Sequence, residues 1–225
     1  MERTEKVSVS FMALGILFTT CLIISNILAF KVITLGPFTA TTAMFLFPIS
    51  YIINDVITEV WGFRKASLLI WCGFGMNFLC IFFFQLAIAA PASNLWPHQQ
   101  AFETVLGSTP RIATASLLAF LAGSFCNAFI MSKMKVASNG RNFSLRAMVS
   151  TLFGELSDSL LFFTLCFSFI LPAEEILKMI IFQTSVKSGY EALVLPFTRI
   201  IVKRIKQSEK TDIYDQKKDY KIIAL

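Results

Sequence analysis

Long apolar runs separated by short polar segments dominate this chain. Six of these runs are about 20 residues or longer, which is enough for a helix to cross a bilayer core of roughly 30 Å. They are predicted at residues 7–30, 39–58, 66–90, 112–131, 147–171 and 176–202. The pattern predicts an all-α integral membrane protein. Its six transmembrane helices would form one domain over residues 1–206, followed by a charged cytoplasmic tail over residues 207–225.

Composition and charge support this assignment. Hydrophobic residues make up 56% of the 225 residues, and the mean hydropathy of +0.69 is too high for an ordinary soluble domain. The net charge of +6 could suggest a nucleic-acid partner, but most of the 20 Lys and Arg residues fall in alternate loops and near the chain ends. The positive-inside rule therefore predicts two cytoplasmic termini and an outward loop at residues 91–110.

The first apolar run and the spacing of polar residues add two expectations about organisation. The first run lacks the small-residue cleavage site of a signal peptide, so we expect it to be retained. Asn26 precedes Asp55 by 29 residues, and Asn127 precedes Glu155 by 28. This similar spacing suggests two inverted three-helix halves, an arrangement that many transporters share.

The strongest candidate for chemistry is the stretch from Phe47 to Gly62. Read as a helix, it places Tyr51, Asn54 and Asp55 on one face, with Glu59 at the edge of that face. A carboxylate in the middle of a bilayer costs roughly 2.5–3.5 kcal/mol, so these groups should face protein or water. The competing interpretation for Glu59 is that it merely marks the helix end.

Two later runs also carry ionisable residues. Asp55, Glu155 and Lys187 each lie nine residues from a charged residue at a predicted helix boundary, or about 13 Å at 1.5 Å per residue. This common depth predicts a polar cavity near the midplane, where transporter sites usually lie. The candidate binding residues are Tyr51, Asn54, Asp55, Glu59, Asn127, Glu155, Asp158, Gln183, Lys187 and Tyr190.

The same residues could instead form a buried ion-pair network in which Asp55 or Glu155 neutralises Lys187. The carboxylates outnumber the lysine, so at least one of them needs a ligand, a proton or water. We find no enzyme motif, no metal-ligand spacing around His98 or the five cysteines, and no sign of a cofactor. Proton coupling through a carboxylate stays open.

Several of these residues lie in stretches that resemble a known family. The segment FPISYIINDVITEVWG at residues 47–62 resembles the signature of the queuosine-precursor transporter family, also called the vitamin uptake transporter family. Residues 25–31, 144–159 and 187–196 are similar to its other conserved stretches, and the resemblance covers about residues 10–205. Asn127 and Glu191 depart from the family pattern, which often has an Asp and a small residue there.

The resemblance implies an importer of 7-deazaguanine bases in the inner membrane of a bacterial cell. Candidate substrates are 7-cyano-7-deazaguanine, 7-aminomethyl-7-deazaguanine and queuine. A guanine-like edge presents two N–H donors that a carboxylate accepts side by side, and Asn54, Asn127 or Gln183 could read the carbonyl edge. Two alternatives are a substrate-binding subunit of an energy-coupling-factor transporter, which needs a separate ATPase module, and a membrane protein without a ligand.

Overall fold

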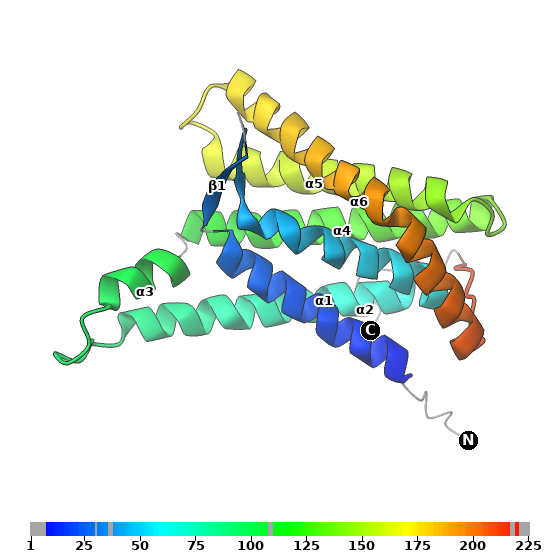
Figure 1. Cartoon of the computed structure of the whole chain (residues 1–225), viewed down its shortest axis with the longest axis horizontal. Helices are drawn as coiled ribbons and strands as arrows, with labels where there is room; N and C mark the ends of the chain where they lie inside the picture. The colour runs from blue at the N-terminus through cyan, green and yellow to red at the C-terminus, as the bar shows by residue number, and fades with distance from the viewer. Residues whose placement is uncertain (1–7, 30, 36–37, 108–109, 217–218, 221–225) are drawn as a thin grey trace.

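The fold is a set of long helices with one short hairpin between the first two (Figure 1). The computed structural model describes residues 8–29, 31–35, 38–107, 110–216 and 219–220. The two strands are antiparallel, and Val32 pairs with Thr41. In chain order the elements are α1 (Val9–Leu28), β1 (Val32–Leu35), β2 (Phe38–Thr41), η1 (Thr42–Phe45), α2 (Phe47–Ala89), α3 (Gln99–Leu106), α4 (Pro110–Ala137), α5 (Phe143–Phe167) and α6 (Ala173–Glu209).

The element α2 consists of two helices that meet at Gly62. The backbone there is non-helical, with φ 83° and ψ 174°. In Figure 1 the chain of α2 leaves the hairpin, crosses the molecule and doubles back, so its two parts run in opposite directions. Glycine suits this elbow because positive φ is strained for other residues, and a Cβ here would lie 2.6 Å from Oδ1 of Asp215.

The helical class predicted from the sequence is confirmed, with differences in detail. By length and composition, four helical stretches of the described chain could cross a membrane: Val9–Leu28, Thr42–Ala89, Gln99–Ala137 and Phe143–Phe167. Charged residues recur along α6, which is not among them. The second expected run was placed at about residues 39–58, and in the structure β2 continues to Thr41 before the helical part of this run begins. The count of six crossings and the inverted halves stay predictions.

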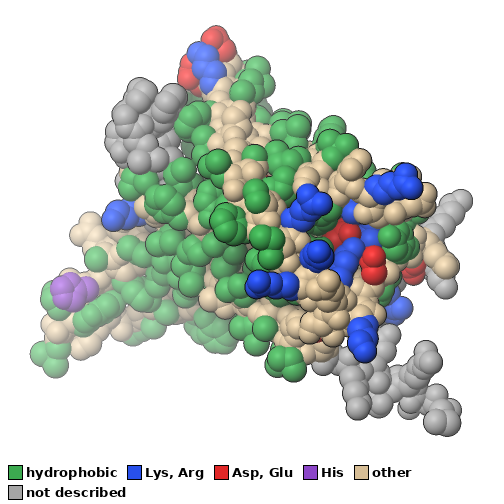
Figure 2. All heavy atoms as spheres, turned by 45° about the vertical axis from the view of Figure 1, so that its right-hand side comes forward, with side chains coloured by type: hydrophobic (Ala, Val, Ile, Leu, Met, Phe, Trp, Pro, Cys, Tyr) green, Lys and Arg blue, Asp and Glu red, His purple; other side chains and the backbone are tan. Residues whose placement is uncertain are grey.

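The apolar interior joins α1, both parts of α2 and α4. Phe18 of α1, Ile57 and Ile70 of α2, and Phe120 of α4 are among its buried members. Many large apolar side chains point outward instead and cover the flanks in Figure 2, as a lipid-facing surface requires. Lys and Arg gather toward one end of the molecule, where the α4–α5 turn and the end of α6 lie.

The segment after α6 packs against the elbow of α2. The Asp215 carboxylate accepts hydrogen bonds from the Phe63 backbone N–H at 3.0 and 2.9 Å and from the Ser132 hydroxyl. The Ile213 N–H donates to the Val60 carbonyl at 3.2 Å. A carboxylate here satisfies an N–H at the start of a helix and complements its dipole. From the sequence, these residues were expected in a charged tail that follows the helical domain; in the structure they pack against the helices of that domain.

The contact between Asp215 and the elbow predicts a stability effect. Asp215→Ala should lower the free energy of unfolding by about 1–3 kcal/mol, because the buried Phe63 N–H loses its acceptor. Glu174→Ala is the matched control, since its carboxylate is 78% exposed and pairs only with a surface lysine. Thermal unfolding of the detergent-purified variants would measure both, and equal melting temperatures would contradict the assignment.

Candidate functional site

The polar face of α2 is buried inside the helical assembly. Tyr51, Asn54, Asp55, Thr58 and Glu59 are each 3% exposed or less. These side chains recur at spacings of three and four residues, so they form one stripe on the helix. The stripe faces α4, α5 and α6, and its two acidic groups reach different surroundings.

Lys187 of α6 lies between two carboxylates of α5. Its Nζ is 2.7 Å from Oε2 of Glu155 and 2.9 Å from Oδ2 of Asp158. The same ammonium group lies 4.2 Å from the centre of the Phe47 ring. All three charged side chains are largely shielded from solvent. The structure thus joins Lys187 to Glu155, as one interpretation of the sequence proposed, and adds Asp158.

Glu59 belongs to a second ion cluster near the basic end of the molecule. Its Oε2 is 2.5 Å from Nη1 of Arg146, and its Oε1 is 2.6 Å from Nζ of Lys206. Lys135 donates to the Glu59 backbone carbonyl at 2.5 Å. Glu59 therefore does more than mark a helix end. It ties α2 to α5 and α6.

Asp212 extends this second cluster into the segment after α6. Its Oδ1 is 2.6 Å from Nζ of Lys135 and 2.8 Å from Nζ of Lys206. Partial burial by itself would raise the pKa of the Asp212 carboxyl, but the hydrogen bonds from the two lysines outweigh it. The pKa of Asp212 is consequently held below its ordinary value.

No lysine or arginine among the described residues pairs with Asp55. It lies beside Glu191 of α6 and Asn127 of α4. Neither carboxylate oxygen of Asp55 has a hydrogen-bond partner among the described residues, and the side chain is 0% exposed. The Tyr51 hydroxyl and Oδ1 of Asn54 are likewise unpartnered within this part of the chain. Three polar side chains on neighbouring turns of α2 thus retain free hydrogen-bonding capacity.

Asn127 holds this region together across three helices. Its Oδ1 accepts a hydrogen bond from Nδ2 of Asn54 at 2.9 Å, and its Nδ2 donates to Oγ1 of Thr151 at 3.3 Å. Nδ2 of Asn54 also donates to the Ser124 carbonyl at 3.1 Å. Because both ends of the Asn127 amide are engaged, this residue is better suited to positioning than to reading a ligand.

Two glycines let α4 and α5 approach closely beside Tyr51. A Cβ at Gly154 would lie 2.8 Å from Cβ of Asn127, 3.0 Å from the Gly123 carbonyl and 3.0 Å from Cε1 of Tyr51. A Cβ at Gly123 would collide with the Tyr51 hydroxyl. The Tyr51 ring is therefore seated against the contact between these two helices.

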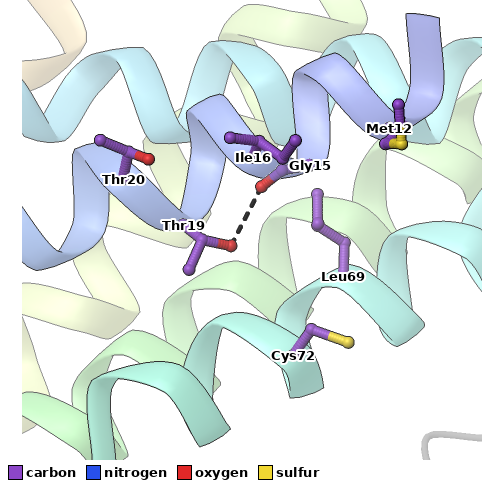
Figure 3. Close-up of a pocket in the computed structure, with 7 residues that line it drawn as sticks. All are labelled: Met12, Gly15, Ile16, Thr19, Thr20, Leu69 and Cys72. Carbon is purple, nitrogen blue, oxygen red and sulfur yellow. Dashed lines mark hydrogen bonds between the residues drawn. The ribbon is translucent and has the colours of Figure 1, made fainter. Parts of the chain in front are cut away.

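Two surface clefts lie away from these polar groups. One, of about 400 Å³, lies between α1 and α2 (Figure 3). It is lined mainly by apolar side chains: Met12, Gly15, Ile16, Thr19, Thr20, Leu69 and Cys72. The other, of about 490 Å³, lies at the α4–α5 turn beside Arg199. The predicted midplane cavity is neither of these, and the polar groups of α2 are closed in.

The remaining predicted residues and several unpredicted ones complete the picture. Gln183 and Tyr190 are half-buried on α6, but within the described chain neither joins the hydrogen bonds of the two ion clusters. Arg146 lies just before the predicted run at residues 147–171 and was therefore expected in a basic loop, but it is 1% exposed. Glu191 drew attention in the sequence as a departure from the family pattern, and the structure buries it beside Asp55.

An apolar helical exterior around buried, unneutralised carboxylates defines a multi-pass membrane protein of the transporter class. Comparison with known proteins gives the family. Residues 41–201 match the family described as "Putative vitamin uptake transporter", and the chain belongs to this family. It is a family of transporters rather than enzymes.

One relative and the search of solved structures complete the comparison. The chain is 27% identical over 188 residues to a Bacillus subtilis (strain 168) protein named "Probable queuosine precursor transporter". The alignment covers 83% of this chain and 82% of that protein. No solved structure matches significantly.

The close approach of α4 and α5 predicts which glycines tolerate a side chain. Gly154→Ala should destabilise the protein by about 1–3 kcal/mol, because its methyl group would collide with Asn127 and Tyr51. Gly75→Ala is the control, since a Cβ there meets nothing within 4 Å and alanine favours a helix. Melting temperatures in detergent test this difference, and a stable Gly154→Ala variant would disprove the tight contact.

The lysine cluster predicts a second effect. Lys187→Met should cost roughly 3–5 kcal/mol, because Glu155 and Asp158 are left as buried anions without a cation. Adding Glu155→Gln should restore part of the lost stability, since it removes one of those charges. Lys178→Met, at an exposed lysine of the same helix, is the control. If the double variant melts no higher than Lys187→Met, the charge explanation fails.

Proposed function

We propose that this protein imports queuosine precursors of the 7-deazaguanine class across the bacterial inner membrane. The observation that supports this most directly is its similarity to the Bacillus subtilis protein named "Probable queuosine precursor transporter". In the proposed topology the chain crosses the membrane six times, because the two parts of α2 and the long α6 each count as one crossing. Both ends are cytoplasmic, which places the basic end of the molecule inside the cell.

Asp55 is the proposed anchor for the substrate. A 7-deazaguanine ring presents an N1–H and an exocyclic amine on one edge, and an ionised carboxylate accepts both side by side. Among the buried acids, Glu155 and Asp158 are paired with Lys187, and Glu59 is paired with Arg146 and Lys206. The oxygens of Asp55 have no such partner among the described residues.

Tyr51 and Asn54 complement this anchor on the same helix. The Tyr51 hydroxyl can donate to the carbonyl of the base, and Oδ1 of Asn54 can accept from a remaining N–H. Lys187, with Glu155 and Asp158, forms the wall beside Tyr51 and keeps α5 and α6 together. The ion cluster at Glu59 seals the basic end of the same interior. Gln183 and Tyr190 lie along α6, where they could contact the substrate once the helices separate.

The substrate has to enter through a rearrangement, because the anchor is sealed in the conformation described here. α6 is the element that supplies Lys187, Glu191 and Lys206 to the three groups of charges facing α2 and α5. Movement of α6 against α2 would expose Asp55 without unfolding either helix. Such motion of one helical unit against another is the usual basis of alternating access.

Binding to the purified protein tests the proposal. We expect a 7-deazaguanine to raise the melting temperature, corresponding to about 2.7 kcal/mol at a concentration 100-fold above the dissociation constant. The ligands are 7-cyano-7-deazaguanine, 7-aminomethyl-7-deazaguanine and queuine. Asp55→Asn should abolish the shift, because an amide can no longer accept both N–H groups. Glu174→Gln, which changes an exposed acid, should keep it.

Two results would contradict this proposal. An absence of stabilisation by all three bases would argue against the substrate class. Full stabilisation of Asp55→Asn would remove the anchor while leaving the substrate class intact. Uptake of labelled base into vesicles that contain only this protein separates an autonomous importer from a subunit that needs a partner ATPase.

A further inference from the structure

The pair formed by Asp55 and Glu191 has no counterpart elsewhere in the described molecule. The two carboxylates come from α2 and α6 and lie side by side, with exposed fractions of 0% and 2%. Both oxygens of Asp55 and Oε2 of Glu191 have no hydrogen-bond partner among the described residues. The other buried acids on the helices, Glu59, Glu155 and Asp158, each have a lysine or arginine within 3 Å.

The groups that face this pair do not neutralise it. Asn127 of α4 and Thr151 of α5 are uncharged. Glu59 of α2 adds negative charge, and its own cations are held at the basic end. Lys187 lies one turn from Glu191 on α6, but its ammonium is bound to Glu155 and Asp158.

Glu155 and Asp158 both lie near Tyr51, and Glu155 also lies near Glu191, so the neighbouring charges of α5 are acidic as well. Two adjacent carboxylates in such surroundings cannot both remain ionised, and they share a proton instead.

We propose that Glu191 takes the proton it shares with Asp55 when the substrate binds, so that Asp55 is ionised in the complex. This inference rests on the proposed function. With the proton on Glu191, Asp55 carries the charge and can accept both N–H groups of a 7-deazaguanine. The protonated Glu191 then donates its O–H to the Asp55 carboxylate, whereas an ionised Glu191 would repel it. Glu191 acts on the substrate only through Asp55, so it is a positioning residue.

The substrate should bind poorly when the Asp55–Glu191 pair holds one proton more or one proton fewer than this. When a proton is added, Asp55 becomes neutral and loses an acceptor oxygen. When the shared proton is lost, Glu191 becomes an anion beside an anionic Asp55, and no lysine or arginine of the described chain pairs with either of them. Closing the site around the ligand then requires a proton to be taken up from water. Substrate affinity should therefore pass through a maximum as the pH rises.

The pH profile of 7-cyano-7-deazaguanine binding to the purified full-length protein tests this inference. For the unmodified protein we expect a bell-shaped profile, with affinity falling up to about tenfold per pH unit on the alkaline side as one proton is lost. Glu191→Gln holds this position neutral, so the alkaline fall should disappear while the acid fall remains. Glu175→Gln, at an exposed acid of the same helix, should keep both.

Titration of the ligand itself would appear in every variant. Comparing Glu191→Gln with Glu175→Gln therefore separates it from the titration of Glu191. Should Glu191→Gln not fold, calorimetry of the unmodified protein in two buffers of different ionisation enthalpy counts the protons directly. We expect uptake approaching one proton per ligand on the alkaline side and release on the acid side.

The results separate this inference from the proposed function. A flat pH profile, an alkaline fall that survives in Glu191→Gln, or zero proton exchange at every pH would overturn the role of Glu191 while 7-deazaguanine binding stands. An absence of binding at any pH, for protein shown to be folded, would overturn both.

Discussion

The arrangement of this protein depends on the cost of placing carboxylates in an apolar, lipid-facing assembly. Five buried acids lie on α2, α5 and α6, which are otherwise largely hydrophobic, and each must be neutralised or left for a ligand. Glu155 and Asp158 share Lys187, while Glu59 holds Arg146 and Lys206. Asp55 and Glu191 face one another, and neither pairs with a cation of the described chain. This difference divides residues that hold the helices together from residues that remain available for chemistry.

The contacts between helices explain how this division is maintained. Gly123 and Gly154 bring α4 and α5 close together, so the Tyr51 ring and the Asn127 amide are held at one level. Asn127 uses both ends of its amide to connect α2 with α5. Asp55 is left beside this network rather than within it, since its oxygens have no partner in the described chain. A rigid frame around a reactive group is what a binding site requires.

At the basic end of the molecule, buried polar and charged groups are also satisfied by partners from other segments of the chain. Gly62 allows α2 to reverse, and the reversal exposes an N–H at the start of the returning helix. Asp215 satisfies that N–H, and Asp212 bridges Lys135 and Lys206 close to Glu59. The segment after α6 therefore completes the packing of the elbow. Any movement of α6 would be transmitted to these contacts, because Lys206 of α6 pairs with both Glu59 and Asp212.

Local patterns in the sequence determined the helical class, the approximate helix positions and the polar side chains that could not face lipid. They identified Asp55, Glu155 and Lys187 because ionisable residues stand out in apolar runs. Only the tertiary structure decided their partners. Glu59 pairs with Lys206, 147 residues away, and Arg146 proved to be a buried partner instead of a loop residue. The physical reason is that helical periodicity defines the faces of each helix but not which faces meet, and the pairing of buried charges depends entirely on that meeting.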